Sequence, residues 1–366
     1  MTNPLKFLQY KLDQTAMYRT VTLALLFLVA ISFTFSLLSL LSFSVFELAT
    51  ALVICVGFAL VTNFVFAIPL KIPANHESAL ITGLIIFFLF LPPRSLDDAV
   101  WLSVAVIVGV ASKYIIAYKK QHIFNAAALG AVAVSAVYID GNPLLEAPWW
   151  IGSPPLFIPL VLAGAAVVTK IRKWTPVLAF LLVAYVVFVY EQLNFGDTVW
   201  SATETFFLSW PALFLAFFML TEPFTLPGTK KKQVAYGALV GFLSSTAIFA
   251  NYLPMTPELA LLIGNLAFFP LTLRQKLYLE LKKKVLVAER TWEFTFKKPD
   301  GMHFKAGQYL EWTVPHQQQD NRGQRRYFTI ASAPEESDLR LALRVESEGG
   351  STFKSALQEL EVGETI

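Results

Sequence analysis

The residue types best suited to chemistry lie near the end of the chain, in Arg325-Arg326-Tyr327-Phe328-Thr329. A guanidinium can neutralise a pyrophosphate through two parallel hydrogen bonds. An aromatic ring can stack on a flat ring system, and a hydroxyl can hydrogen-bond one of its nitrogens. If the segment is a strand, Arg326 and Phe328 share one face, and Tyr327 and Thr329 share the other. The pattern predicts a flavin dinucleotide site, and the alternative is an ordinary strand with two surface arginines.

Two neighbouring segments extend this candidate site. Upstream, residues 304–310 predict a turn followed by a strand. Downstream, Gly349-Gly350-Ser351-Thr352 precedes an amphipathic segment over residues 353–360. Paired glycines let backbone amides approach a phosphate closely, and a helix that follows them presents its positive end to it. His303 and His316 flank the first segment, and we predict that both are surface residues rather than catalytic ones.

Together the three segments resemble the FAD-binding barrel of the ferredoxin–NADP reductase family, over roughly residues 282–366. The resemblance implies that Arg326 contacts phosphate and that Thr329 lies near the reactive flavin nitrogen as the catalytic hydroxyl. It also implies that residues 349–352 hold the pyrophosphate of an FAD cofactor. Either Tyr327 or Phe328 would face the isoalloxazine ring, because the family pattern also aligns one residue earlier, with Arg325 in front.

The composition places most of the chain in a membrane. Of the 366 residues, 55% are hydrophobic and 15% are charged, and the mean hydropathy is +0.56. Soluble proteins have about 25% charged residues. The net charge of +3 is too small to argue for a nucleic-acid partner. The single cysteine, Cys55, cannot form an internal disulfide or hold a zinc or iron–sulfur site, so we predict no metal centre.

Apolar segments long enough to cross a bilayer, which takes about 20 residues, define the domain organisation. The predicted order is an N-terminal cytoplasmic segment (1–19), a transmembrane domain (20–275), a basic linker (276–284) and the barrel (285–366). Short segments in both halves are typical of broken helices around a central site. The ten candidate spans are residues 20–42, 46–69, 78–92, 97–117, 124–139, 155–170, 175–193, 204–220, 234–251 and 257–272.

The charges of the predicted loops alternate in sign along the chain. One set of loops holds most lysines and arginines, Lys113 and Lys230–Lys232 among them, and the opposite set holds acidic residues. Basic residues favour the cytoplasmic side. We therefore predict a multi-pass protein of a prokaryotic inner membrane, with both termini in the cytoplasm.

Four segments of the membrane part resemble a second family, which comprises the RnfD protein of Rnf electron-transport complexes and the NqrB protein of the sodium-pumping NADH:quinone oxidoreductase. They are residues 76–84, 124–130, 217–225 and 261–266, in family order. The resemblance implies ten helices with an internal inverted repeat. Family members carry FMN on a threonine, but Pro154 occupies that place here and Ser153 is a remote substitute. Covalent FMN is therefore not expected, whereas a second, noncovalent flavin between helices stays open.

Polar residues at predicted helix ends form a candidate flavin or ion site within the membrane. Polar groups at that depth are costly unless they line a cavity or meet a ligand. Helix capping and interhelical hydrogen bonds are the alternative explanation. A partner for the carboxylate at position 222 is expected at Lys230 or Lys231. The candidates are Ser78, Thr82, Asn125, Thr221, Glu222 and Thr225.

The combined interpretation is a membrane flavoprotein oxidoreductase. It would pass electrons from NAD(P)H or a protein donor through FAD to a carrier in or near the membrane, with ion translocation left open. Its partners would be lipid and other membrane subunits. The chain stops inside the last part of the barrel, so we expect the barrel to be incomplete and the nicotinamide domain to be absent. The alternatives are a solute carrier with a regulatory flavin-binding barrel and a non-catalytic membrane subunit of an electron-transport complex.

Overall fold

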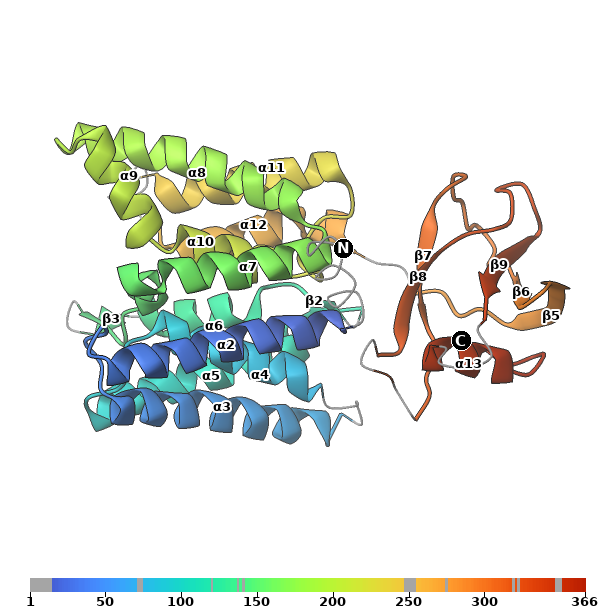
Figure 1. The fold of residues 1–366 in the computed structure, drawn as a ribbon, viewed down its shortest axis with the longest axis horizontal. Helices are drawn as coiled ribbons and strands as arrows, with labels where there is room; N and C mark the ends of the chain where they lie inside the picture. Colours follow the sequence, from blue (N-terminus) through green and yellow to red (C-terminus); the bar gives the residue numbers. More distant parts are fainter. Residues whose placement is uncertain are drawn as a thin grey trace, which may run out of the picture. The chain divides into compact units, whose positions relative to one another are not determined.

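The computed structural model describes residues 15–70, 75–119, 121–136, 138–139, 142–246, 255–273, 276–317, 320, 323–345 and 351–366. Gly349 and Gly350 of the predicted pyrophosphate site lie outside these ranges. The chain forms two compact units (Figure 1). The helical unit is Met17–Leu273, and the other unit contains the described residues from 276 to 366.

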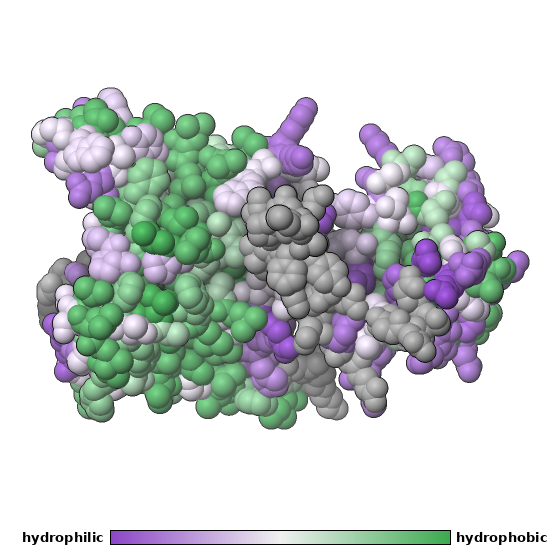
Figure 2. All heavy atoms as spheres, viewed as in Figure 1, coloured by the Kyte–Doolittle hydropathy of each residue, from purple (hydrophilic) through white to green (hydrophobic). Residues whose placement is uncertain are grey.

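The helical unit consists of apolar helices joined by short connections (Figure 1). Its surface is largely hydrophobic on the face shown in Figure 2. Short hairpins, β1–β2 (Ala117–Tyr118, Gln121–His122) and β3–β4 (Tyr138–Ile139, Asn142–Pro143), and 3-10 turns, η1 (Trp150–Gly152) and η2 (Pro154–Leu156), connect some of the helices. The helices are α2 (Met17–Leu37), α3 (Val45–Ala67), α4 (His76–Leu89), α5 (Leu96–Ile115), α6 (Ala126–Ser135), α7 (Phe157–Ile171), α8 (Trp174–Asn194), α9 (Val199–Leu208), α10 (Ala212–Phe214) with the π-helical turn η3 (Leu215–Met219), α11 (Lys230–Ser245) and α12 (Pro257–Thr272).

Each of the ten predicted apolar segments overlaps helix in this unit, but ten membrane crossings are not confirmed. Within the described residues, five helices are long and apolar enough to span a bilayer. A sixth span arises if α9 and Ala212–Met219, which are bent by 50°, count as one. Helices α4, α6 and α12 have 14, 10 and 16 residues. At 1.5 Å per residue they are too short to cross about 30 Å of hydrocarbon alone.

Helix packing follows the same order in the two halves of the helical unit. In the first half α3 packs on α5, and α5 packs on α6; in the second half α8 packs on α11, and α11 packs on α12. Contacts between α2 and α7 and between α6 and α12 join the halves. This order agrees with an internal repeat, while its inverted orientation stays a prediction.

Close approach of α5 and α6 depends on Gly130, and this yields a first prediction. A β-carbon at Gly130 would overlap the carbonyl oxygen of Ala105. Gly130→Ala is therefore expected to destabilise the helical unit by about 2 kcal/mol, because backbone rather than a flexible side chain must move. Thermal unfolding of the purified protein in detergent measures the loss. Gly57→Ala is the control, since nothing lies within 4 Å of the corresponding β-carbon, and an unchanged or higher melting temperature is expected there.

Among its described residues, the second unit has five strands and one helix around its own hydrophobic core. All strand pairs are antiparallel, in a sheet of order β5-β6-β9 and a separate pair β7-β8. The core includes Phe294, Phe296 and Leu341, which alternate along their strands with more exposed residues. The elements are β5 (Leu281–Ala288), β6 (Thr291–Lys297), β7 (Tyr309–Thr313), β8 (Arg325–Thr329), β9 (Asp338–Arg344) and α13 (Thr352–Glu359).

The described strands form two sheets and no closed barrel, because β8 and β9 meet only just past the end of β8, where Ala331 N donates to Arg340 O and Arg340 N to Ser332 Oγ. One expectation about this unit is corrected. Lys282–Lys284, predicted as a linker, lie in strand β5. Lys282 forms an ion pair with Asp338. The alternation that predicts strands is local, whereas closure of a barrel depends on contacts between distant strands.

Candidate functional site

Strand β8 presents the predicted flavin residues on two faces. Arg326 and Phe328 are half-buried on one face, whereas Arg325, Tyr327 and Thr329 are exposed on the other. This is the alternation expected of a strand. Arg326 pairs across the sheet with Trp312, and Thr329 pairs with Tyr309. Phe328 is therefore the only other residue of β8 whose side chain shares the face of Arg326.

The Arg326 guanidinium lies at the start of helix α13. Its Nη2 donates to Asp320 Oδ1 at 3.0 Å and to Ser351 Oγ at 3.4 Å. Its Cζ lies 5.5 Å from the centre of the Phe353 ring, and the Phe328 ring is 5.7 Å from the same ring. A cation, a helix N-terminus and two aromatic rings therefore meet at one place.

Thr352, the first residue of α13, is held by a histidine that sequence analysis predicts to be a surface residue. His316 is half-buried; its Nδ1 lies 2.8 Å from Val314 O, and its Nε2 lies 3.0 Å from Thr352 Oγ1. A carbonyl only accepts, so we assign the proton to Nδ1 and let Nε2 accept from the Thr352 hydroxyl. The Asp320 N–H in turn donates to Thr352 Oγ1 at 3.0 Å.

These residues fit a phosphate group of a dinucleotide, with one condition. Ser351 is the N-cap of α13 but makes no side-chain capping bond, and a helix N-terminus beside a guanidinium attracts anions. The Asp320 carboxylate already forms an ion pair with this guanidinium. Both side chains are largely buried, with exposed fractions of 20% for Asp320 and 17% for Arg326. A bound phosphate must take the place of that carboxylate.

The membrane candidates largely come together in a second place, a cavity of about 60 Å³ at one end of the helical unit. Such a volume holds roughly four water molecules. Apolar side chains of α2 and α7 form part of its wall. Five of the six predicted residues line it, and Thr225 does not; instead, the buried Thr225 hydroxyl donates to the carbonyl of residue 222 at 3.3 Å. The polar lining residues are Ser78, Thr82, Lys113, Asn125, Thr221 and Glu222.

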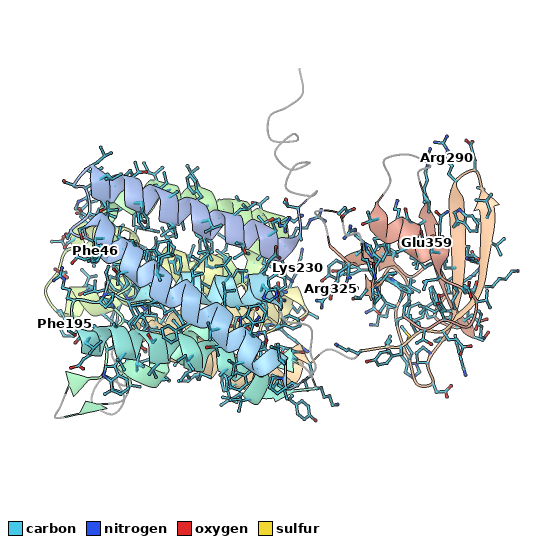
Figure 3. All side chains as sticks on the ribbon, turned by 90° about the horizontal axis from the view of Figure 1, so that it is seen from below. Phe46, Phe195, Lys230, Arg290, Arg325 and Glu359 are labelled. Atoms are coloured by element: carbon cyan, nitrogen blue, oxygen red, sulfur yellow. The ribbon has the colours of Figure 1, made fainter. Side chains whose placement is uncertain are left out.

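Glu222 has partners other than the predicted lysines. Its Oε1 lies 2.8 Å from His122 Nε2, and its Oε2 accepts from Asn125 Nδ2 at 2.9 Å. Lys230 and Lys231 are instead exposed at the start of α11. Figure 3 shows Lys230 at one end of the helical unit. His122 lies in β2, one hundred residues before Glu222, so only the fold reveals this pair.

Asn125 organises the polar end of helix α6. Its side chain caps the helix by accepting from Ala128 N at 3.0 Å, which is the usual role of an N-cap asparagine. Its own backbone N–H donates to Asn265 Oδ1 at 2.8 Å, and Asn265 Nδ2 donates to the Tyr236 hydroxyl at 2.7 Å. One residue thus joins Glu222 to α6, α12 and α11.

Lys113 is a further functional candidate that the sequence alone does not reveal. Its charge groups it with the loop cations, although it falls inside the predicted span 97–117. The structure places it in the last turn of α5. Its Nζ donates to Ser78 O and Ser78 Oγ at 2.8 Å each and to Thr82 Oγ1 at 2.6 Å.

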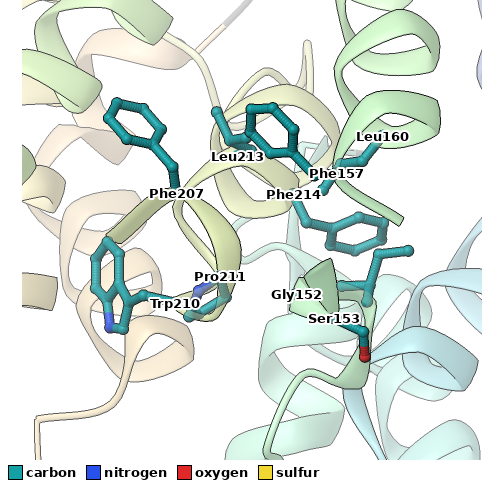
Figure 4. Close-up of a pocket in the computed structure, with 10 residues that line it drawn as sticks. Gly152, Ser153, Phe157, Leu160, Phe207, Trp210, Pro211, Leu213 and Phe214 are labelled. Carbon is teal, nitrogen blue, oxygen red and sulfur yellow. The ribbon is translucent and has the colours of Figure 1, made fainter. Parts of the chain in front are cut away.

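Gly152 and Ser153, where the sequence predicts no covalent FMN, line a different and very small cavity (Figure 4). Its volume is about 10 Å³, and Ser153 lines it together with Trp210 and Phe214. The Ser153 hydroxyl donates to Trp150 O at 2.6 Å. That hydroxyl stabilises the turn before Pro154, and the absence of covalent FMN stays a prediction.

The apolar helices define a multi-pass membrane protein. Residues 155–274 match the family model described as the NQR2, RnfD, RnfE family. The match covers α7 to α12 and includes the segment with Thr221, Glu222 and Thr225. It supports a membrane domain like that of RnfD and NqrB, and with it the role of a membrane component in an electron-transport complex.

Proposed function

We propose that this chain is a flavoprotein oxidoreductase of a membrane electron-transport complex. In this proposal FAD binds at Arg326, Ser351 and Thr352, receives electrons from NAD(P)H or a protein donor, and passes them to a carrier in or near the helical unit. The observation that carries the proposal is the Arg326 guanidinium at the N-cap of α13, 3.4 Å from Ser351 Oγ. The family match of residues 155–274 supports the electron-transport setting.

Each of the residues around Arg326 would contact a different part of the FAD. The guanidinium and the first turn of α13 would pair with the pyrophosphate. Phe328 shares the face of Arg326, so we propose its ring, rather than that of Tyr327, as the neighbour of the isoalloxazine. Thr329, which ends the strand, would supply the hydroxyl near the reactive nitrogen. Bound FAD would accept a hydride as two electrons and release them singly.

The setting of the reaction is also part of the proposal. Both termini would lie on the cytoplasmic side of a prokaryotic inner membrane, where reduced nicotinamide is available, and other membrane proteins of the complex would supply or accept electrons. A second, noncovalent flavin in the helical unit would require the cavity of about 60 Å³ to widen, because pockets for ligands of this size measure about 300 Å³ or more.

The test is the flavin content of purified protein. The chain is purified in detergent, its flavin is released by heat or acid, and the flavin is identified by chromatography with fluorescence detection. One FAD per chain is expected. A folded preparation that neither retains FAD nor binds added FAD would remove the flavin part of the proposal. Uptake of a solute into liposomes without reduced nicotinamide would instead favour the solute-carrier alternative.

A further inference from the structure

The most unusual group in the helical unit is the ammonium of Lys113. Lysine offers three N–H donors, and here three oxygens receive them: Ser78 O, Ser78 Oγ and Thr82 Oγ1, at 2.6 to 2.8 Å. The Thr82 hydroxyl itself donates to Ser78 O at 3.1 Å, which leaves its lone pairs free to accept. The first turns of α4 therefore form a cage of oxygens around a positive charge.

This cage has the chemistry of a site for a monovalent cation. Carbonyl and hydroxyl oxygens are hard, neutral ligands, the kind that replace the hydration shell of an alkali-metal ion. Lysine carries a compact charge on a flexible stem. Because Lys113 is fixed to α5, its ammonium is present at a high effective concentration, and a free cation competes with it poorly.

The charges around the cavity are already balanced. Among its described lining residues, Lys113 and Glu222 are the only charged side chains. Both carboxylate oxygens of Glu222 face nitrogen groups, His122 Nε2 on one side and Asn125 Nδ2 on the other. A further cation would add an uncompensated charge at membrane depth, where desolvation makes it costly.

We propose that Lys113 is a tethered cation. Its ammonium fills an oxygen cage that would otherwise take a free monovalent cation, and it balances Glu222 across the cavity without a bound metal ion. The proposal concerns the helical unit alone and does not depend on the flavin site. It predicts that the cage becomes a binding site for small cations once the lysine side chain is removed.

Lys113→Ala tests this in the full-length protein in detergent. Melting temperatures are measured in ammonium, potassium, sodium and N-methylglucamine chloride at constant ionic strength. In N-methylglucamine the variant should melt at least about 3 °C below wild type. Ammonium should restore most of this loss with a saturable dose dependence, because it reproduces the missing donor group. Wild type should show no saturable response to any of the four cations.

Two further variants separate the cage from general effects of salt. Lys119→Ala removes an exposed lysine just beyond α5 and should melt like wild type in all four salts. Lys113→Met keeps the volume of the stem inside the cage, so it should be destabilised but not rescued. Indifference of Lys113→Ala to ammonium, or equal rescue by N-methylglucamine, would overturn the proposal. If Lys113→Ala does not fold, the wild-type titration decides: saturable stabilisation by sodium or potassium refutes it, and a flat response supports it.

Discussion

Arg326→Ala is expected to weaken FAD binding by about 10- to 100-fold, the equivalent of losing one or two charge-assisted hydrogen bonds. The guanidinium donates to the hydroxyl of Ser351, the N-cap residue of α13. Titration of flavin-free protein with FAD, followed by quenching of flavin fluorescence, measures the change in Kd.

Three other variants sharpen this experiment. Arg290→Ala removes an arginine that Figure 3 shows away from Arg325, at another end of the same unit, and should leave Kd unchanged. Arg325→Ala separates the two alignments of the motif, since Arg325 lies on the opposite face, 4.0 Å from Glu311. Asp320→Asn should tighten binding, because it removes the carboxylate that competes with phosphate. Equal Kd values for Arg326→Ala and wild type would show that the site is not where we place it.

Glu222→Ala is expected to destabilise the helical unit by about 3 kcal/mol, the largest stability effect that we predict. Removing the carboxylate takes away the partner of His122 Nε2 and leaves Asn125 Nδ2 only its longer bond to Met219 O at 3.3 Å, and a buried polar group left unpaired costs about 1–3 kcal/mol. It also leaves the Lys113 ammonium without its balancing charge. The Glu222 side chain is 21% exposed, so water offsets part of this cost. Thermal and denaturant unfolding in detergent measure the loss.

Glu222→Gln and Glu204→Ala complete this second experiment. The amide oxygen of glutamine can still accept from one of the two nitrogens, so its loss should be smaller than that of alanine. Glu204 is exposed in α9, and its replacement should change stability by less than about 0.5 kcal/mol. If Glu222→Ala unfolds like Glu204→Ala, the buried network does not stabilise the bundle.

Local patterns predict the elements of this chain much better than they predict its contacts. The apolar segment 257–272 is helix α12, whose start Thr256 caps by accepting from Leu259 N, and Pro270 lies only in its last turn. The alternation over 325–329 predicts which residues of β8 share a face. By contrast, Lys113 contacts residues 31 and 35 positions away, and His122 contacts Glu222 across 100. Such pairs depend on how the helices pack, and the local periodicity of the sequence carries no information about that packing.

How far the two sheets join is not predictable from the sequence for a related reason. The strands predicted around residues 285–287, 292–296 and 339–345 are present as β5, β6 and β9. Whether they join β7 and β8 depends on register across a long connection, and the described residues leave them as two sheets over one core. His316 is a smaller example: its role at Thr352 depends on α13 folding back onto β7 and β8.

The chain of hydrogen bonds from Asn125 through Asn265 to the Tyr236 hydroxyl has a mechanical consequence. It ties α6 of the first half to α11 and α12 of the second half by buried hydrogen bonds. Transport by rocking one repeat against the other would break these bonds in every cycle, at a cost of about 1 kcal/mol or more for each. These hydrogen bonds hold the two halves together at this end of the bundle. Such a rigid arrangement suits a frame for moving electrons better than a carrier that alternates between two open states.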